Sequence, residues 1–532
     1  MTESSKKRKY EIWQPLLLAL VLAGGMLLGT RLDDELPNLS KPTYTAKQED
    51  PWDELKKVIG FIESRYGDTL PIDSISQEAI HLLVKNLDPH SYYLSGLEYR
   101  GFKERMMGSY VGIGIDYSII DDTMYLLKVI PGSPAEKSGL IKGDQIMEVN
   151  HDTVSGKGLT SKEAYEIWKK SDQIIQLAVL KNKKIEEFEI EKGPINLHSV
   201  PVGTLVDSLT GYIKIDRFAS DTYREFMDHL EKLAEKGMQN LIIDVRENPG
   251  GSLDQVIKII NQLVDERDQL LLYTEGLHSK RVEYKSTGKT FFPLKEIVVI
   301  INENSVSASE VLAGVLQDLG RATIVGRRSY GKGLVQEMYD LTPESAINLT
   351  VAKYYLPSGR SIQKSYKDRD QYEHELDDRF GNGELFSEDS MVINEKDAMN
   401  DNQGKMRPSG EGIVPDVFVA ADSFFFSPGW KAQEYKIYSD AFIFYLRHRQ
   451  AITDSLHKGI SLEVFNDSIL NRPMFSEENG MDSMTKQKVL EGYFHLIQWH
   501  HYGPDQYFEK MVDEDEEIQT ALEVIKDPPR YE

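Results

Sequence analysis

The sequence predicts an α/β protein whose layered core is flanked by separate helical and β-rich segments. Residues 196–365 alternate apolar strands with helical stretches, which is the pattern of a layered α/β core. Residues 108–195 instead read as short alternating strands broken by Gly and Pro, and residues 51–105 have the apolar spacing of helices. The chain has 532 residues, enough for three or four domains at roughly 150 residues each.

These patterns divide the chain into consecutive parts. A polar stretch at residues 366–405 interrupts the core and is expected to be a surface insertion or a disordered loop. The parts are a basic cytoplasmic tail (1–11), a transmembrane anchor (12–30), a linker (31–50), an N-terminal helical domain (51–107), a β-rich domain (108–195), the layered core (196–421) and a C-terminal helical extension (422–532).

Within the core, strands and helices are expected in alternation. The run at 296–302 is almost continuously apolar, as expected for a strand buried on both faces. The expected strands are 211–218, 241–245, 296–302 and 322–325, and the expected helices are 221–236, 252–264 and 307–319.

Composition excludes several classes of protein. Hydrophobic residues make up 40% and charged residues 28% of the chain, so it is globular rather than wholly disordered. It has no cysteine, which excludes a disulfide framework, thiolate metal sites and a cysteine nucleophile. Its net charge of −24 makes it a poor nucleic-acid binder.

The N-terminus has a basic cluster followed by an apolar stretch. Residues 6–9 are Lys-Lys-Arg-Lys, residues 12–30 are mostly apolar, and acidic residues follow from Asp33. A membrane span needs about 20 residues, and basic residues before it place the bulk of the chain outside. We therefore expect a signal-anchor and a single-pass inner-membrane protein facing the periplasm. The alternatives are a cleaved signal peptide and a buried soluble helix.

The β-rich domain has the marks of a peptide-binding module. Residues 130–146 place Gly and Pro around a turn, a short helix and a second turn, and Gly112, Ile113, Gly114 and Ile115 lie upstream. Together these segments resemble a PDZ domain. Such a glycine-bearing loop presents backbone N–H groups to a terminal carboxylate, and the ligand adds to the sheet edge as a strand. The alternatives are a β-domain without a ligand and a dinucleotide fingerprint, which lacks its third glycine here.

A serine and a lysine in the core are candidates for nucleophilic catalysis. Ser307 is expected at a strand-to-helix turn, where the helix N-terminus favours negative charge on a bound oxygen. A serine hydroxyl needs a base within reach, and Lys332, which follows the strand at 322–325, is the candidate. To act as a base, its pKa must fall from about 10.4 to about 7–8, chiefly by desolvation. The alternative is an ordinary helix cap and an exposed lysine.

Two further segments bear on this site. Residues 244–252 pass from a strand to a helix through Gly250 and Gly251, whose N–H groups can point at an oxyanion; an ordinary turn is the alternative. Residues 326–332 have P-loop spacing, but residue 333 is Gly instead of the Ser or Thr that holds magnesium. A strand is also expected after it, where a P-loop needs a helix, so we expect no nucleotide site.

Taken together, these residues resemble the carboxy-terminal processing peptidases, also called tail-specific proteases, a serine–lysine family. The string at residues 305–310 is similar to the family's nucleophile motif, in which the middle serine attacks; here that is Ser307. The family pattern has its lysine 25 positions on, at Lys332, and a glutamine four further on, at Gln336, that orients the lysine. The resemblance implies a crotonase/Clp-protease-like layered peptidase core with an inserted PDZ domain.

The resemblance implies further roles. The oxyanion hole would use the N–H groups of Ala308 and of Gly250 or Gly251. The PDZ domain would bind substrate C-termini and gate access to the site. The string Leu87-Asp-Pro-His-Ser91 is another that is similar to the family.

We therefore predict a membrane-anchored serine endopeptidase that recognises apolar protein C-termini and uses Ser307, Lys332 and Gln336. No cofactor, metal or nucleic-acid partner is expected, and the sequence leaves open a homo-oligomer or an activating partner. The main alternative is a catalytically inactive PDZ adaptor or holdase on a protease-like core. A different hydrolase of crotonase-like fold is disfavoured by the PDZ signature.

Overall fold

The computed structural model describes most of the residues that follow the predicted linker. The first unit, Met1–Ser76, contains helix α2 (Pro51–Arg65) and the beginning of α3 (Ile72–Lys85), and the second unit is Gln77–Glu532. The described residues are 19, 21–24, 51–169, 172–181, 183–393, 395–423, 430, 433–472, 475 and 483–528.

The central sheet of the second unit has six strands. Strands β11, β12, β15, β16 and β21 are parallel neighbours in that order, and β10 pairs antiparallel with β11 at the edge. The strands are β10 (Val202–Leu205), β11 (Thr210–Lys214), β12 (Asn240–Asp244), β15 (Ile297–Ile301), β16 (Thr323–Gly326) and β21 (Val417–Phe418). The strand predicted at 211–218 ends earlier than expected, at Lys214.

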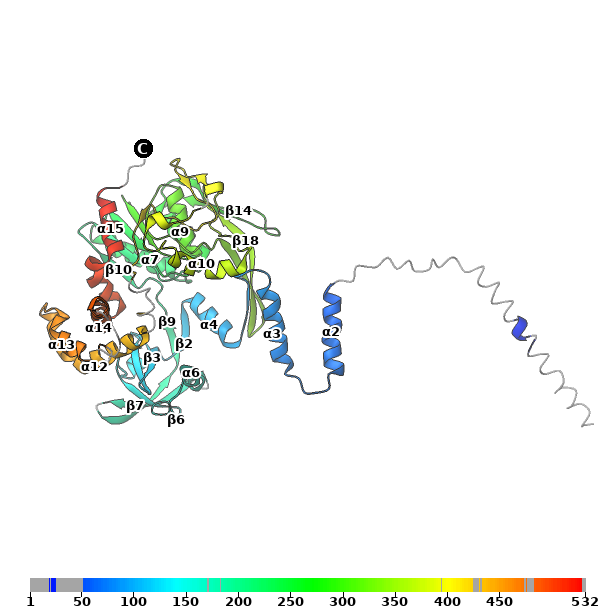
Figure 1. The fold of residues 1–532 in the computed structure, drawn as a ribbon, viewed down its shortest axis with the longest axis horizontal. Helices are drawn as coiled ribbons and strands as arrows, with labels where there is room; N and C mark the ends of the chain where they lie inside the picture. The colour runs from blue at the N-terminus through cyan, green and yellow to red at the C-terminus, as the bar shows by residue number, and fades with distance from the viewer. Residues whose placement is uncertain are drawn as a thin grey trace, which may run out of the picture. The chain divides into compact units, whose positions relative to one another are not determined.

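Helices cover both faces of this sheet because its buried strands alternate their side chains between two apolar clusters. Ile297, Val299 and Ile301 of β15 pack with α7 (Thr222–Glu235), α8 (Leu253–Leu263) and α9 (Ala308–Asp318). Val298 and Ile300 pack on the opposite face with α15 (Glu516–Lys526). Figure 1 shows α15, the last helix of the chain, beside the core. The last helix of the predicted extension therefore completes the core.

A second sheet packs beside the first and includes a strand from the predicted helical domain. β1 (Tyr92–Ser95) lies between α3 and α4 (Gly96–Met107) in sequence and pairs with β18 (Ser345–Tyr355). The sheet also contains β13 (Arg267–Glu275), β14 (Val282–Thr287) and β17 (Leu334–Thr342).

Residues 366–405, predicted as a surface insertion or a disordered loop, include a helix. It is α10 (Arg369–Gly381), in which Tyr372 and Arg379 are buried. Two short paired strands, β19 (Met399–Asn400) and β20 (Met406–Arg407), follow it.

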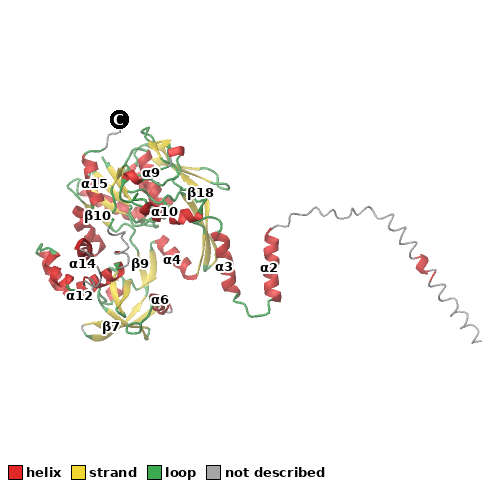
Figure 2. Cartoon of the chain, viewed as in Figure 1, coloured by secondary structure: helices red, strands yellow, loops and turns green. Residues whose placement is uncertain are grey.

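The predicted PDZ domain has its own sheet and apolar cluster. Figure 2 shows its strands gathered apart from those of the core. Helices α5 (Pro134–Lys137) and α6 (Ser161–Lys169) accompany the sheet, whose cluster includes Leu126, Ile146 and Val179. The sheet order is β3 (Ile115–Ile120), β4 (Thr123–Val129), β5 (Gln145–Val149), β7 (Ile174–Lys181) and β8 (Lys184–Glu191), with β6 (Asp152–Thr153) beside β5; β2 (Ser109–Gly112) pairs with β9 (Gly193–Asn196).

The C-terminal helices contact the β-rich domain before the chain returns to the core. The longest are α12 (Glu434–His457) and α14 (Ser483–Met511), which pack together, with α13 (Asn466–Leu470) between them in sequence. Lys142 Nζ donates to the carbonyl of His500 at 2.7 Å, and Tyr435 Oη donates to the carbonyl of Ile119 at 2.8 Å.

The predicted transmembrane anchor at residues 12–30 is wrong, and so is the single-pass inner-membrane location facing the periplasm. No helix in the described part of the chain is long and apolar enough to cross a membrane. A span requires an unbroken apolar helix of about 20 residues, whereas apolar composition alone does not establish one. Of the predicted segment, Ala19 and residues 21–24 are described, as helix, and the rest lies outside the described residues.

Replacing Ile518 by Ala should destabilise the core. Ile518 of α15 is 1% exposed against the sheet, so its truncation should lower the free energy of unfolding by about 2–5 kcal/mol. Denaturant unfolding measures this change. Glu523→Ala, at an exposed position of the same helix, is the control and should change it by less than about 0.5 kcal/mol. Equal unfolding curves for the two variants would mean that α15 does not pack on the sheet.

Candidate active site

Three loops leave the central sheet at the carboxyl ends of neighbouring parallel strands. The glycine loop (245–252) follows β12, the serine loop (302–307) follows β15, and the lysine loop (327–333) follows β16. Parallel strands place their carboxyl ends at one edge of a sheet, where ligands bind in open α/β folds. The core residues singled out in the sequence lie in these loops or just beyond them.

Ser307 stands between β15 and α9 in a strained backbone conformation. It is half-buried and is the N-cap of α9, with φ 56° and ψ −109°. A non-glycine residue held in such a sparsely populated region costs on the order of 1–3 kcal/mol and persists only where its surroundings hold it there. The serine expected at a strand-to-helix turn is therefore found there, and its conformation is typical of a functional site.

Hydrogen bonds join the three loops to one another. Val306 N donates to the carbonyl of Asn248 at 3.0 Å, which ties the serine loop to the glycine loop. Ser305 Oγ donates to the carbonyl of Val245 at 2.8 Å and accepts from Asn302 N at 3.0 Å. Because Ser305 is fully buried and engaged in this way, its hydroxyl serves the structure of the loop.

Glu310 binds the serine loop and the lysine loop with one carboxylate. Its Oε2 accepts from the backbone nitrogens of Ser307 at 2.7 Å and Lys332 at 2.8 Å. Its Oε1 accepts from Ser329 Oγ and from Gly331 N, both at 2.6 Å. Burial raises the pKa of the Glu310 carboxyl, and these four hydrogen bonds oppose that change. The carboxylate therefore fixes the main chain of Ser307 and Lys332 relative to each other.

Sequence reasoning assigned Glu310 no role, although its position carries a signal. A Ser at the N-cap followed by Glu three residues later is the capping-box pattern at the start of a helix. The pattern predicts the hydrogen bond from Ser307 N. It says nothing of the contacts with the lysine loop, which lies 19 to 22 residues away in sequence.

Lys332 and Gln336 lie side by side. Lys332 Nζ donates to Gln336 Oε1 at 2.7 Å, and Gln336 Nε2 donates to the backbone carbonyl of His90. Burial lowers the pKa of Lys332 and outweighs the carboxylates of Glu310 and Asp88, which act in the opposite direction. In the described part of the chain no hydrogen bond joins Ser307 Oγ to Lys332 Nζ.

The turn between α3 and β1 supplies a part of the site that the sequence analysis did not assign. The Asp88 carboxylate accepts from the backbone nitrogens of His90 and Ser91 at 2.8 Å each, which shapes the turn. Burial lowers the pKa of His90 to about 4, with a further contribution from Lys332 that Asp88 opposes. His90 Nε2 hydrogen-bonds Tyr372 Oη of α10. The family-like string at 87–91 was the signal in the sequence that could have identified this turn. Tyr372 comes from residues 366–405, the polar segment that was predicted as an insertion.

Gly250 lies against the serine loop and Gly251 lies against Phe218, and both have conformations that favour glycine. Gly250 has φ +95°, and a Cβ there would lie 2.7 Å from the carbonyl of Val306 and 3.0 Å from Ala308 N. Gly250 N donates to Asn248 Oδ1 at 2.8 Å. Among the described residues, no hydrogen bond engages the N–H groups of Gly251 or Ala308. Backbone N–H groups of this kind are what an oxyanion hole requires.

The predicted peptide-binding residues connect β2 to β3, and β3 is an edge strand of the larger sheet of this domain. Gly112 ends β2, and β3 begins at Ile115 and pairs on one side with β4. The carbonyls of Ile113 and Gly114 accept from Ala135 N and Ile130 N, both at 2.9 Å. These bonds fix the loop. β3 is the outermost strand of its sheet and has a neighbouring strand on one side only.

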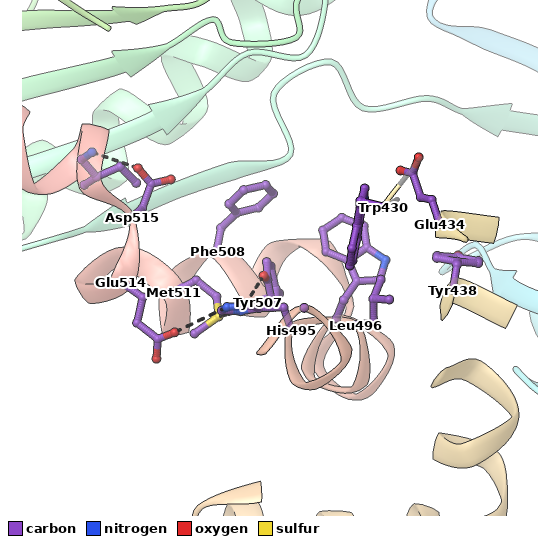
Figure 3. Close-up of a pocket in the computed structure, with 13 residues that line it drawn as sticks. Trp430, Glu434, Tyr438, His495, Leu496, Tyr507, Phe508, Met511, Glu514 and Asp515 are labelled. Carbon is purple, nitrogen blue, oxygen red and sulfur yellow. Dashed lines mark hydrogen bonds and ion pairs between the residues drawn. The ribbon is translucent and has the colours of Figure 1, made fainter. Parts of the chain in front are cut away.

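A cavity of about 460 Å³ lies among the C-terminal helices, away from these loops. Figure 3 shows Tyr507 and Glu514 directed toward His495, with Trp430 and Tyr438 beside them. None of its lining residues belongs to the three loops, so it is not where a substrate would meet Ser307. No group of His, Asp and Glu within the described residues is arranged to hold a metal ion.

Two family models and several known proteins match parts of this chain. The model of peptidase family S41 matches residues 209–372, and the PDZ domain model matches residues 111–191. A "Probable CtpA-like serine protease" of Staphylococcus aureus strain COL is 27% identical over 367 residues, which cover 68% of this chain and 72% of that protein. A protein of the same name from Staphylococcus epidermidis is 27% identical over 364 residues, covering 68% and 73%. The solved structure of the photosystem II D1 C-terminal processing protease is 22% identical, with a TM-score of 0.37 and coverage of 70% and 87%.

The S41 match spans all three loops, and the PDZ match spans the separate β-rich domain. The recognition made from the sequence is therefore confirmed, as is the mixed α/β peptidase core with a PDZ domain. This chain is a serine-type peptidase and is similar to the C-terminal processing peptidases.

Proposed function

We propose that this peptidase cleaves peptide bonds with Ser307 as nucleophile and Lys332 as general base, and that its PDZ domain binds the C-termini of its protein substrates. The observation that carries the assignment of nucleophile and base is the Glu310 carboxylate. Its Oε2 accepts from the backbone nitrogens of both Ser307 and Lys332. The lowered pKa of Lys332 supports it further, since a lysine must be neutral to accept a proton.

In the proposed reaction, Ser307 Oγ forms a bond to the scissile carbonyl carbon as its proton passes to neutral Lys332 Nζ. The carbonyl oxygen gains negative charge, which the N–H groups of Ala308 and Gly251 stabilise. The C–N bond then breaks, and Lys332 passes its proton to the leaving amine. Water hydrolyses the resulting ester with Lys332 again as base, which restores Ser307.

Gln336 holds the lysine in this scheme. Its Oε1 accepts from Nζ, and its Nε2 is itself held by the carbonyl of His90, which fixes the direction of the side chain. Because Gln336 is neutral, it orients the lysine without favouring the charged form as a carboxylate would.

The PDZ half of the proposal is supported by the edge position of β3. An extended C-terminus can add beside β3 as a further strand, with its carboxylate at the Gly112–Ile115 loop. Substrates would then be proteins with accessible C-termini, and apolar ones are expected to bind best.

Ser307→Ala should abolish cleavage of an unfolded protein that ends in an apolar tail, because it removes the proposed nucleophile. Ser305→Ala is the matched control in the same loop. It should lower the free energy of unfolding by about 1–3 kcal/mol, because Asn302 N and the Val245 carbonyl lose a buried partner, yet retain cleavage. Cleavage rates and denaturant unfolding distinguish the two effects. Cleavage that survives in Ser307→Ala would refute the assigned nucleophile.

Gln336→Glu should move the pH profile of cleavage. The rate rises with pH as Lys332 loses its proton, and burial places this rise below the pH of an ordinary lysine. A carboxylate next to Nζ favours charged lysine and should raise its pKa by about 1–3 units, so the rise should move to higher pH by a similar amount. Glu337→Gln, at an exposed neighbouring position, is the control. An unmoved profile in Gln336→Glu would argue against Lys332 as the base.

The sequence of the substrate tail should control the rate. The parent enzyme should cleave a protein with an apolar C-terminus faster than the same protein with a charged C-terminus, chiefly through KM, because tail binding precedes cleavage. Equal KM values would contradict tail recognition and leave the peptidase assignment intact. Tail binding without cleavage by the parent would favour the inactive adaptor.

A further inference from the structure

The helix α15 begins beside the edge of the sheet that bears the three loops. Asp515 is its N-cap and accepts from Ile518 N at 3.0 Å (Figure 3), and Glu517 lies in its first turn. Both residues lie far beyond the S41 match, which ends at residue 372. Their carboxylates nevertheless reach the loops that carry the proposed catalytic groups.

Arg246 links α15 to the glycine loop. Its two terminal nitrogens donate to the two Asp515 carboxylate oxygens at 3.1 and 2.9 Å, a bidentate pair of the strongest kind. Arg246 Nη1 also donates to Glu517 Oε2 at 3.1 Å. Asp244, the last residue of β12, forms a further ion pair with Arg246 at 2.6 Å, and its side chain is fully buried.

Arg327 links α15 to the other two loops. It is the first residue of the lysine loop, and its Nη1 donates to Glu517 Oε1 at 2.8 Å. Its Nε donates to Oε2 of Glu303, in the serine loop, at 2.7 Å. Glu517 therefore bridges Arg246 and Arg327 with its two oxygens, and through them it touches all three loops.

These charges are shielded from solvent, which makes the geometry of the cluster specific. The side chains of Arg327 and Glu303 are 8% and 3% exposed, and those of Arg246 and Glu517 are 13% and 16% exposed. Ion pairs on a solvated surface contribute little and tolerate many geometries, whereas a buried charge that loses its partner forces its neighbours to rearrange. Here the neighbours that would move are the loops.

We propose that Glu517 and Asp515 are positioning residues for proteolysis, which set the relative placement of the glycine, serine and lysine loops through Arg246 and Arg327. This inference rests on the proposed reaction. It makes the C-terminal helix a part of the catalytic machinery without contact with substrate. Small displacements of reacting groups reduce rates strongly, so loss of the bridge should appear in kcat.

Glu517→Gln tests the proposal, with Glu516→Gln as its matched control. Both substitutions remove one negative charge from the first turn of α15, but Glu516 is exposed, and its side chain makes no ion pair among the described residues. At a temperature well below unfolding, Glu517→Gln should lower kcat at least about tenfold with KM within about twofold, and Glu516→Gln should change neither. Asp515→Asn, which keeps an oxygen to cap Ile518 N, should lower kcat in the same direction.

Amide hydrogen exchange gives a readout that needs no substrate. Glu517→Gln should speed exchange in residues 302–309 and 327–333, while Glu516→Gln should leave these segments unchanged. A lowered melting temperature with parental kcat and parental exchange in the loops would make Glu517 merely structural and overturn the proposal. If Ser307→Ala still cleaves, the proposed reaction fails instead, and the exchange experiment continues to decide whether α15 positions the loops.

Discussion

A single buried carboxylate, that of Glu310, sets the geometry on which the rest of the site depends. All four of its hydrogen-bond partners act as donors, three of them backbone N–H groups. An ionised carboxylate offers about four acceptor positions, whereas a protonated acid would direct its own O–H at one of these donors. The arrangement therefore requires the ionised form, although burial raises the pKa of Glu310. The strained backbone of Ser307 is held in place because its N–H is one of those donors.

The topology of the sheet explains why one side chain can reach two loops. β15 and β16 are adjacent and parallel, so the loops that follow them begin side by side. Glu310 lies in the first turn of α9, which follows the serine loop, and its carboxylate also accepts from the lysine loop. The glycine loop, on the other side, is joined through the hydrogen bond from Val306 to Asn248. The loops thus form one unit, and the α15 carboxylates contact it from the opposite face of the sheet.

Local patterns in the sequence were enough to predict the inner strands β11, β12, β15 and β16, the helices α7, α8 and α9, and the position of Ser307 between a strand and a helix. The alternation of β15 between two apolar faces, and the passage from an apolar run to a helical one, can be seen without a structure. The role of α15 could not be predicted, because its apolar stripe indicates a helix packed on something but not the surface that it covers. The turn that contains Asp88 and His90 was missed for a similar reason, since the contact of His90 with Gln336 spans 246 residues. At the N-terminus, composition indicated a membrane span that the described helices do not contain.

The same carboxylate raises an electrostatic question about Lys332. A full negative charge within about 4–6 Å of an amine ordinarily favours its charged form and raises its pKa by about 1–3 units, which would oppose a role as base. Burial is nevertheless the larger cause, and the pKa of Lys332 is lowered. The loss of hydration around Nζ therefore outweighs the attraction of the Glu310 carboxylate. Gln336 adds a neutral acceptor in place of another carboxylate. The site therefore fixes the lysine with hydrogen bonds while keeping the net field at Nζ weak enough for desolvation to determine its pKa.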